Sequence, residues 1–245
     1  MEDCAALMTD NPEKNRGTWR ALMPSCRELR LEIGCGKGRF VLESAKAEPE
    51  VLFVALEKEQ SAMVMAMEKV ADAGLENIVF IDGDAARLSA MFAPGEVDLI
   101  YLNFSDPWPK SRDAKFRLTA PSFLRSYADV LKPKGELRIK TDNTPLFVWS
   151  VEQLEDEGWE LKDITNDLHR NGPSEIMTDY EARFYATGIR INKVVAIKTS
   201  NTKNTTAGEA KRPRNASLKF MEDIPYPDNT RAAHEADTSF LEDKT

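Results

Sequence analysis

The stretch Leu29-Arg30-Leu31-Glu32-Ile33-Gly34-Cys35-Gly36-Lys37-Gly38 decides the fold of this chain. Apolar residues alternate over residues 29–33, as in a β-strand, and a cluster of glycines then breaks the pattern. Such glycines form a tight turn, because glycine readily takes backbone conformations that other residues avoid. A helix is expected over residues 37–47, before Pro49. A strand, a glycine turn and a helix in this order are the first unit of an α/β fold with a parallel sheet.

Strands and helices alternate along the rest of the chain. Apolar, β-branched runs predict strands over residues 51–56, 77–81, 97–104 and 135–140. Helical spacing and capping residues predict helices over residues 60–73, 119–131 and 144–158. The last strands are expected over residues 159–164 and 184–198, in a long mixed pattern typical of an antiparallel hairpin. The chain is therefore predicted to form a doubly wound, Rossmann-like α/β sheet, mostly parallel with a C-terminal antiparallel hairpin.

Composition divides the chain into three parts. Residues 1–27 form an irregular N-terminal segment, with a short helix expected around residues 19–23, and residues 28–198 carry the alternating strands and helices. Residues 199–245 are rich in Asn, Thr, Lys, Pro and Asp, so we expect a disordered tail, with one basic spot at residues 211–214. The 245 residues, 42% of them hydrophobic, suffice for one sizeable core.

Composition also argues against several classes of protein. No apolar run approaches the roughly eighteen residues that a membrane helix requires, and the acidic start lacks the features of a secretion signal. The three cysteines form no Cys-x-x-Cys pair, which predicts a reducing, cytoplasmic setting and no metal site. A net charge of −8 argues against binding nucleic acid through overall charge, so any contact with RNA must come from a local basic patch.

Acidic residues follow four consecutive strands of the expected sheet. They are Glu57, Asp84, Asp106 and Asp142. Ligands of an open α/β sheet bind at the carboxyl ends of its strands, so these acids and the glycine turn are expected to form one binding edge. Glu57 lies 23 residues after Gly34, the interval at which a carboxylate accepts hydrogen bonds from ribose hydroxyls.

Two nucleotide cofactors compete for this edge. A dinucleotide-binding turn has the pattern G-x-G-x-x-G/A, but Arg39 occupies the last position here. Glu32, two residues before the turn, would repel a pyrophosphate, whereas it would attract the ammonium and the sulfonium of S-adenosylmethionine. The turn therefore favours S-adenosylmethionine over a dinucleotide.

A basic loop follows the fourth strand: Asn103-Phe104-Ser105-Asp106-Pro107-Trp108-Pro109-Lys110-Ser111-Arg112-Asp113-Ala114-Lys115-Phe116-Arg117-Leu118. Its prolines restrict the backbone around Asp106 and Trp108. An acid, an aromatic ring and four cations suit an anionic, stackable substrate such as a nucleotide of RNA. The alternative is a polar loop with a core tryptophan and a solvated run of charge.

These pieces together resemble one family. Over about residues 11–198, the chain is similar to the bacterial tRNA (guanine-N7-)-methyltransferases. The similarity is carried by the glycine turn, the Asp-Pro-Trp-Pro-Lys segment of the basic loop, Thr141-Asp142-Asn143 and Thr178-Asp179-Tyr180-Glu181. The glycine turn is shared by many methyltransferases, but the combination with the other segments is specific. The resemblance implies a class I methyltransferase sheet and transfer of a methyl group from S-adenosylmethionine to N7 of a guanine in tRNA, at position 46 of the variable loop.

The resemblance also implies roles for individual residues. The methyl donor would be bound by Glu32, Gly34, Gly36, Gly38, Glu57, Asp84 and Asp106. The guanosine would be bound by Lys110, Arg112, Asp142, Thr178, Asp179, Tyr180 and Glu181, and Asp106 would also be the acidic residue of the catalytic site. The chain departs from the family at Asp113 and Phe116, where His and Arg are usual, and at residues 1–10, which are acidic where a basic arm is often found. We therefore expect weaker contact with RNA.

Chemistry at guanine N7 makes few demands on the protein. N7 carries an exposed lone pair, so no base must first remove a proton. His169 is accordingly expected in a loop rather than in a catalytic dyad. Asp106 or Asp142 would accept hydrogen bonds from the guanine N1–H and N2 amino groups and stabilise the growing positive charge. Two other interpretations are left open: methylation of an exocyclic amine on a base or on glutamine, and a non-catalytic RNA-binding module. A monomer or a homodimer is expected.

Overall fold

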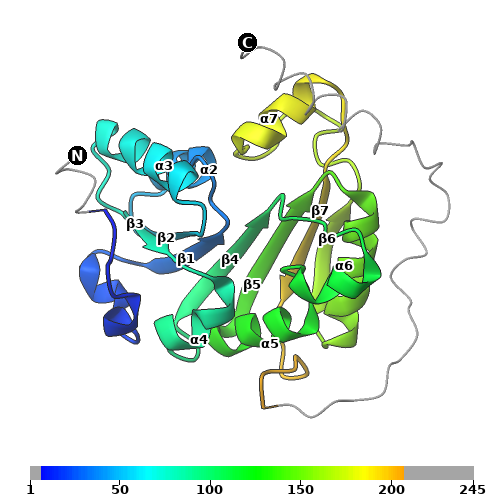
Figure 1. The fold of residues 1–245 in the computed structure, drawn as a ribbon, viewed down its shortest axis with the longest axis horizontal. Helices are drawn as coiled ribbons and strands as arrows, with labels where there is room; N and C mark the ends of the chain where they lie inside the picture. Colours follow the sequence, from blue (N-terminus) through cyan, green and yellow to red (C-terminus); the bar gives the residue numbers. More distant parts are fainter. Residues whose placement is uncertain (1–6, 207–245) are drawn as a thin grey trace.

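The structure, a computed structural model, describes residues 7–206, and a seven-stranded sheet runs through their centre (Figure 1). The strands are β1 (Glu28–Ile33), β2 (Val51–Glu57), β3 (Ile78–Asp82), β4 (Val97–Asn103), β5 (Leu131–Thr141), β6 (Glu160–Thr165) and β7 (Asn192–Ile197). Their order across the sheet is β3-β2-β1-β4-β5-β7-β6. The pairs among β1 to β5 are parallel, whereas β7 runs antiparallel to β5 and β6. The predicted fold class is confirmed.

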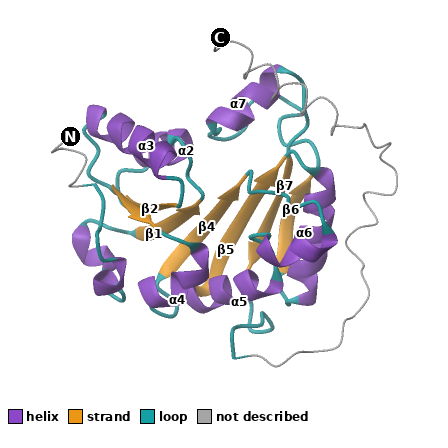
Figure 2. Ribbon diagram, viewed as in Figure 1, coloured by secondary structure: helices purple, strands orange, loops and turns teal. Residues whose placement is uncertain are grey.

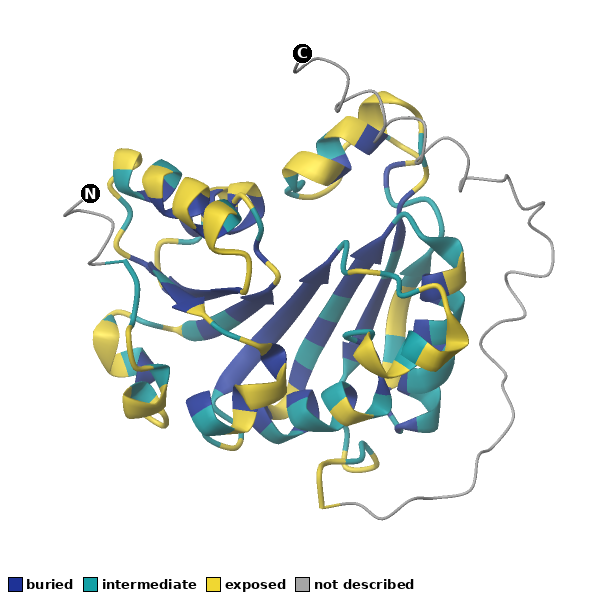
Figure 3. Ribbon diagram, viewed as in Figure 1, coloured by how far each residue is buried: buried dark blue, intermediate teal, exposed yellow. Residues whose placement is uncertain are grey.

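Helices cover the sheet on both faces (Figure 2). On one face lie α2 (Arg39–Ala47) and α3 (Gln60–Asp72), whose buried residues form a core cluster with Phe53 and Tyr101. On the other face lie α4 (Leu88–Met91), α5 (Pro121–Val130) and α6 (Thr144–Asp156), which form a larger cluster with the apolar residues of β1, β4 and β5. Because β1 and β4 are covered on both sides, they are buried along most of their length (Figure 3). Burial on both faces explains why β4 is a near-continuous apolar run.

Short 3₁₀ helices and one further α-helix complete the described chain. They are η1 (Pro12–Asn15), η2 (Trp19–Leu22), η3 (Ala85–Arg87), η4 (Ser111–Phe116) and α7 (Asp179–Ala186). Trp19 is fully buried, and its Nε1 donates a hydrogen bond to the carbonyl of Met91 at 2.9 Å. The short helix expected around residues 19–23 therefore exists and attaches the N-terminal segment to α4.

The strand expected over residues 184–198 is wrong in its first half. Residues 179–186 form α7, and β7 begins only at Asn192. The reason is a capping box: the Thr178 hydroxyl accepts from the Glu181 N–H at 2.9 Å, and the Glu181 carboxylate accepts from the Thr178 N–H at 3.3 Å. These two bonds satisfy backbone donors that a helix start would otherwise leave free. They therefore stabilise a helix at residues 179–186 in place of the expected strand.

The expected C-terminal tail begins with residues that contact the body. The Thr199 and Thr202 hydroxyls donate to the carbonyl of Gly158 at 3.2 and 3.0 Å, and Lys203 Nζ donates to the carbonyl of Asp156 at 2.6 Å. Residues 199–203 therefore lie against the end of α6. The remainder of the tail, with the basic spot at residues 211–214, lies outside the described residues, as do residues 1–6.

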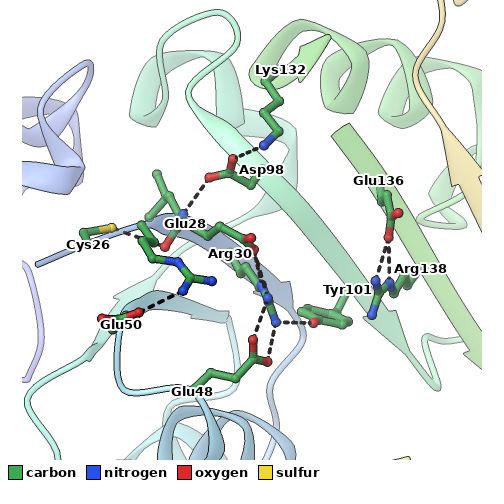
Figure 4. Close-up of polar contacts among 12 residues, drawn as sticks. Cys26, Glu28, Arg30, Glu48, Glu50, Asp98, Tyr101, Lys132, Glu136 and Arg138 are labelled. Carbon is green, nitrogen blue, oxygen red and sulfur yellow. Dashed lines mark hydrogen bonds and ion pairs between the residues drawn. The ribbon is translucent and has the colours of Figure 1, made fainter. Parts of the chain in front are cut away.

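A polar network holds the sheet at the end opposite to the glycine turn (Figure 4). Asp98 is buried at the start of β4, accepts from the Leu29 N–H at 2.7 Å and pairs with Lys132 at 2.5 Å. Burial alone would raise the pKa of Asp98, but these two hydrogen bonds and the charge of Arg20 lower it below its ordinary value. The carboxylate therefore stays ionised and joins β1, β4 and the start of β5.

Candidate active site

The candidate site lies at the switch point of the sheet. β1 and β4 are neighbours, but the chain runs outward from β1 to β3 before it returns to β4, so the crossovers after β1 and β4 leave the sheet on opposite sides. Such a point leaves a crevice at the carboxyl ends of the strands. Here it is a cleft of about 330 Å³, and four of the predicted donor-binding residues line it: Gly34, Glu57, Asp84 and Asp106. Apolar side chains form much of the rest of the lining, among them Ile33, Leu56, Ala85, Leu118 and Phe123.

The glycine turn is tied to Glu57. The Gly36 N–H donates to Glu57 Oε2 at 2.8 Å, and the Lys58 and Glu59 N–H groups both donate to Oε1 at 2.9 Å. One carboxylate thus sets the path of two strand ends and keeps lone pairs for further donors.

Gly38 occupies a position where only glycine fits. Its φ is +78°, and a Cβ there would lie 2.5 Å from the Cβ of Ala66 in α3. The absence of a side chain therefore lets α3 approach the start of α2 closely.

Glu32 and Asn103 form a buried pair under the cleft. Asn103 Nδ2 donates to Glu32 Oε1 at 2.8 Å, and Glu32 is only 1% exposed. Burial raises the pKa of Glu32 to about 7, against the opposing effects of the Asn103 hydrogen bond and the Lys140 charge. Glu32 Oε2 and Asn103 Oδ1 have no hydrogen-bond partner among the described residues. Two buried acceptors without donors suit a ligand that brings N–H groups and positive charge.

The loop that carries Asp106 has a constrained backbone. Phe104 and Trp108 have φ values of +55° and +42°, which non-glycine residues seldom adopt. Arg117 holds the loop in this shape, because its Nε donates to the Pro107 carbonyl at 3.0 Å and its Nη2 to the Trp108 carbonyl at 2.9 Å. Asp106 is exposed at the cleft, and no described residue donates a hydrogen bond to its carboxylate. Its carboxylate is thus free to accept from a ligand.

The loop places its cations differently from one another. Lys110 and Arg112 are exposed, with Arg112 Nε 3.9 Å from Asp113 Oδ2, and Lys115 Nζ lies 5.0 Å from the centre of the Phe116 ring. Arg117 instead points inward and stacks over Trp149 at 4.5 Å. Three of the four cations can therefore meet a phosphate, while the fourth shapes the loop.

The other predicted substrate residues come from β5 and α7. Asp142 follows β5 and is half-buried, and burial raises its pKa above the ordinary value. Asp179 pairs with Lys69 at 3.5 Å and with Arg39 at 3.7 Å, and the Tyr180 ring centre lies 5.5 Å from that of Phe104. The first turn of α7 thus reaches the Asp106 loop. Glu181, in contrast, is completely buried.

Sequence reasoning missed several residues of this region. Asn103 and Phe104 stand in the predicted basic loop without a role of their own, and Lys140 stands only in a predicted strand, although a lysine inside an apolar strand is itself a signal of a buried partner. His169 does lie in a loop, as expected, but it is buried, with Nε2 2.9 Å from Glu181 Oε1. No sequence pattern shows that pairing, because twelve residues separate the partners across irregular chain.

Two further features are absent from residues 7–206. None of their helices combines the length and the apolar character that a membrane span requires. They contain no group of three or more His, Cys, Asp or Glu side chains arranged to bind a metal ion.

Comparison with known proteins places this geometry in a class. A family model described as a putative methyltransferase matches residues 27–194. The fold is similar to that of the 16S rRNA methyltransferase KamB, with a TM-score of 0.58 and 19% identity over 75% of this chain and 93% of that one. It is also similar to the 16S rRNA (adenine(1408)-N(1))-methyltransferase from Catenulisporales acidiphilia, with a TM-score of 0.56 and 18% identity over 78% and 95% of the two chains. The fold is that of the Rossmann-like methyltransferases.

Sequence relatives narrow the class. The chain is 41% identical to the tRNA (guanine-N(7)-)-methyltransferase of Bacillus cytotoxicus over 80% of this chain and 91% of the relative. It is 43% identical to the enzyme of the same name from Geobacillus kaustophilus, over 77% and 87% of the two chains. The chain belongs to the bacterial tRNA (guanine-N7-)-methyltransferase family.

Proposed function

We propose that this protein methylates N7 of a guanine in tRNA, with S-adenosylmethionine as the methyl donor. Relatives of about 40% identity share the name tRNA (guanine-N(7)-)-methyltransferase, which supports this activity. Within the structure, the observation that carries the proposal is the cleft at the switch point, with two buried acceptors beneath it and a basic loop at its rim. We assign the catalytic domain to residues 28–198 and a cytoplasmic location to the protein, acting as a monomer or a homodimer.

The residues of the cleft fit this donor. The unpartnered oxygens of Glu32 and Asn103 suit its ammonium and the positive charge of its sulfonium. The Glu57 carboxylate has lone pairs left for ribose hydroxyls, and Asp84 adds a second acid at the mouth of the cleft. Gly34, Gly36 and Gly38 have no side chains, so a ligand can approach the backbone of the turn closely. When bound, S-adenosylmethionine supplies an electrophilic methyl group.

The protein's part in the reaction is to position the guanine and stabilise its charge. The N7 lone pair forms the new bond to carbon, the electrons of the breaking S–CH₃ bond remain on sulfur, and the purine gains a positive charge. We assign to Asp106, or to Asp142 after β5, the acceptance of hydrogen bonds from guanine N1–H and the N2 amino group. Lys110, Arg112 and the residues Thr178, Asp179 and Tyr180 would hold the nucleoside and its phosphates. Positioning of this kind supplies roughly 7–11 kcal/mol in favourable cases.

The test is a methylation assay with identification of the product. Unmodified tRNA is incubated with the enzyme and methyl-labelled S-adenosylmethionine, then digested, and the labelled nucleoside is identified and mapped. We expect 7-methylguanosine from the wild type and from Asp113→Asn, a control in the same loop, and a large loss with Asp106→Asn. An N6-methylated base would instead support an exocyclic-amine methyltransferase, and tRNA binding without transfer would support a non-catalytic module.

A further inference from the structure

Three charged or titratable side chains from separate elements meet below α7. Lys140 Nζ, from β5, donates to Glu181 Oε2 at 2.7 Å, and His169 Nε2, from the loop before α7, lies 2.9 Å from Glu181 Oε1. Glu181 is fully buried, Lys140 is 3% exposed and His169 is 7% exposed. We call these residues the Lys140 cluster. The reaction described above uses none of their charges.

The Glu181 carboxylate is buried and held by three protein donors. It accepts from Lys140, from His169 and from the backbone N–H of Thr178. To reach a guanosine it would have to leave a buried ammonium unpaired, and breaking such a pair from one side is strongly destabilising. A direct contact between Glu181 and the substrate, as the resemblance implies, therefore conflicts with this arrangement.

Lys140 joins the two sides of the substrate region. Its side chain binds α7 through Glu181 and also donates to the Ile176 carbonyl at 3.1 Å. Its own carbonyl accepts from the Phe104 N–H at 2.8 Å, at the start of the Asp106 loop. The Phe104 and Tyr180 rings, whose centres are 5.5 Å apart, form a second contact between the Asp106 loop and α7. Figure 1 shows α7 near the ends of β4 and β5. Its first turn also pairs at the surface with α2 and α3 through Asp179, whereas the contacts of Lys140 are buried.

We infer that the Lys140 cluster is a positioning device, which holds the first turn of α7 at a fixed place against the Asp106 loop and so sets where the target guanine lies. Glu181, Lys140 and His169 are positioning residues in this scheme, and Asp106 and Tyr180 are the groups they place. The inference rests on the proposed function and gives Glu181 a different role from a substrate contact.

Removal of the Glu181 charge is the first test. Glu181→Gln keeps the size of the side chain but leaves the Lys140 ammonium without its counter-charge. We expect kcat for tRNA to fall roughly 10²-fold, because a misplacement of about 1 Å has that effect. Binding of S-adenosylhomocysteine should change by less than about two-fold, since Glu32 and Glu57 stay in place. His169→Gln, which keeps a donor near the position of Nε2, should lose less than His169→Phe.

Glu157 supplies a matched control. Its carboxylate is buried to a similar degree, with 4% exposure, and accepts from Arg125 Nε at 2.7 Å, but it lies at the end of α6. Glu157→Gln therefore removes a buried ion pair outside the cleft. A role in stability alone predicts that both variants lower Tm and that neither changes kcat well below Tm.

A double variant separates positioning from direct contact. Lys140→Met with Glu181→Gln leaves no buried charge unpaired, so we expect it to recover at least about ten-fold of the kcat lost by Glu181→Gln. A direct contact with guanosine predicts no recovery. Burial raises the pKa of Glu32, and the Lys140 charge counteracts part of that rise, so the Lys140→Met change raises this pKa further. The assays are therefore run at about pH 8.5, where Glu32 stays ionised in every variant.

Hydrogen exchange of α7 tests the inference without any activity. The amides of residues 178–186 should exchange faster in Glu181→Gln than in the wild type and should be unchanged in Glu157→Gln. If α7 exchange is unchanged, or if the double variant shows no recovery, the Lys140 cluster is not a positioning device. Faster exchange together with a wild type that forms no 7-methylguanosine would instead overturn the proposed function alone.

Discussion

At the scale of the residue, Glu32 shows how a binding site reduces stability. The ordinary glutamate pKa is 4.5, and in the folded protein burial raises the pKa of Glu32 to about 7. Between these two values the folded chain holds more protons than the unfolded chain, so stability falls as pH rises. Above pH 7 the cost reaches about 3 kcal/mol. A bound cation would offset this cost, which is why an unpaired carboxylate fits a binding site better than a core.

Glu32→Gln should therefore change both stability and binding with pH. We expect the wild type to lose stability between about pH 4.5 and 7 relative to the variant, and S-adenosylhomocysteine to bind the wild type more tightly at pH 8 than at pH 6. The variant should bind weakly at both values. Thermal unfolding and calorimetric titration measure these effects, with the exposed Glu43→Gln as control. The same pH dependence of stability in wild type and variant would show that Glu32 is not the titrating group.

At the scale of the element, the loop after β4 divides its cations between two tasks. Arg117 donates to two loop carbonyls and stacks on Trp149, so it supports the strained backbone at Trp108. Lys115 is exposed, over the half-exposed ring of Phe116. A sequence reading treats the two side chains as one basic run, but only Lys115 faces solvent.

The two cations should accordingly give opposite mutant phenotypes. Lys115→Ala is expected to flatten the dependence of log Kd for tRNA on log salt by about one unit and to leave kcat nearly unchanged. Arg117→Ala should keep the salt dependence and lower kcat, because the Asp106 loop loses its support. Filter binding at several salt concentrations and single-turnover rates test both. A reduced slope in Arg117→Ala would mean that this guanidinium also meets phosphate.

At the scale of the whole molecule, the chain that follows β7 is part of the fold for a few residues. Thr199, Thr202 and Lys203 satisfy the last carbonyls of α6 and of Gly158. A Cβ on Gly158 would meet the Asn201 carbonyl oxygen at 2.3 Å, so the two segments approach as closely as glycine allows. The structural boundary of the folded body therefore lies beyond the compositional boundary at residue 198.

Two truncations test this boundary. A chain of residues 1–198 should unfold about 4–8 °C lower than the full chain, since several net hydrogen bonds worth about 2 kcal/mol together are lost. A chain of residues 1–206 should keep both the Tm and the kcat/KM for tRNA of the full protein. A several-fold loss of kcat/KM in the chain of residues 1–206 would assign a contact with tRNA to residues 207–245.

The sequence by itself determined the order of strands and helices, the glycine turn, the acids at the strand ends and the family. These features are local: period-two alternation, glycine and proline positions and short motifs are complete within a few residues. Over residues 184–198 the local strand pattern predicts the wrong element for the first half, because the capping box of Thr178 and Glu181 starts a helix just before it.

Only the tertiary structure decided which of these residues are buried and what they touch. Asn103 reaches Glu32 across 71 residues of chain, and Lys140 reaches Glu181 across 41. Arg117 turns inward because loop carbonyls lie within its reach, which no spacing predicts. Burial and pairing depend on which strands become neighbours, and that choice is made by the packing of the whole chain. For that reason the sequence could name Glu181 but could not show that its carboxylate is already bound.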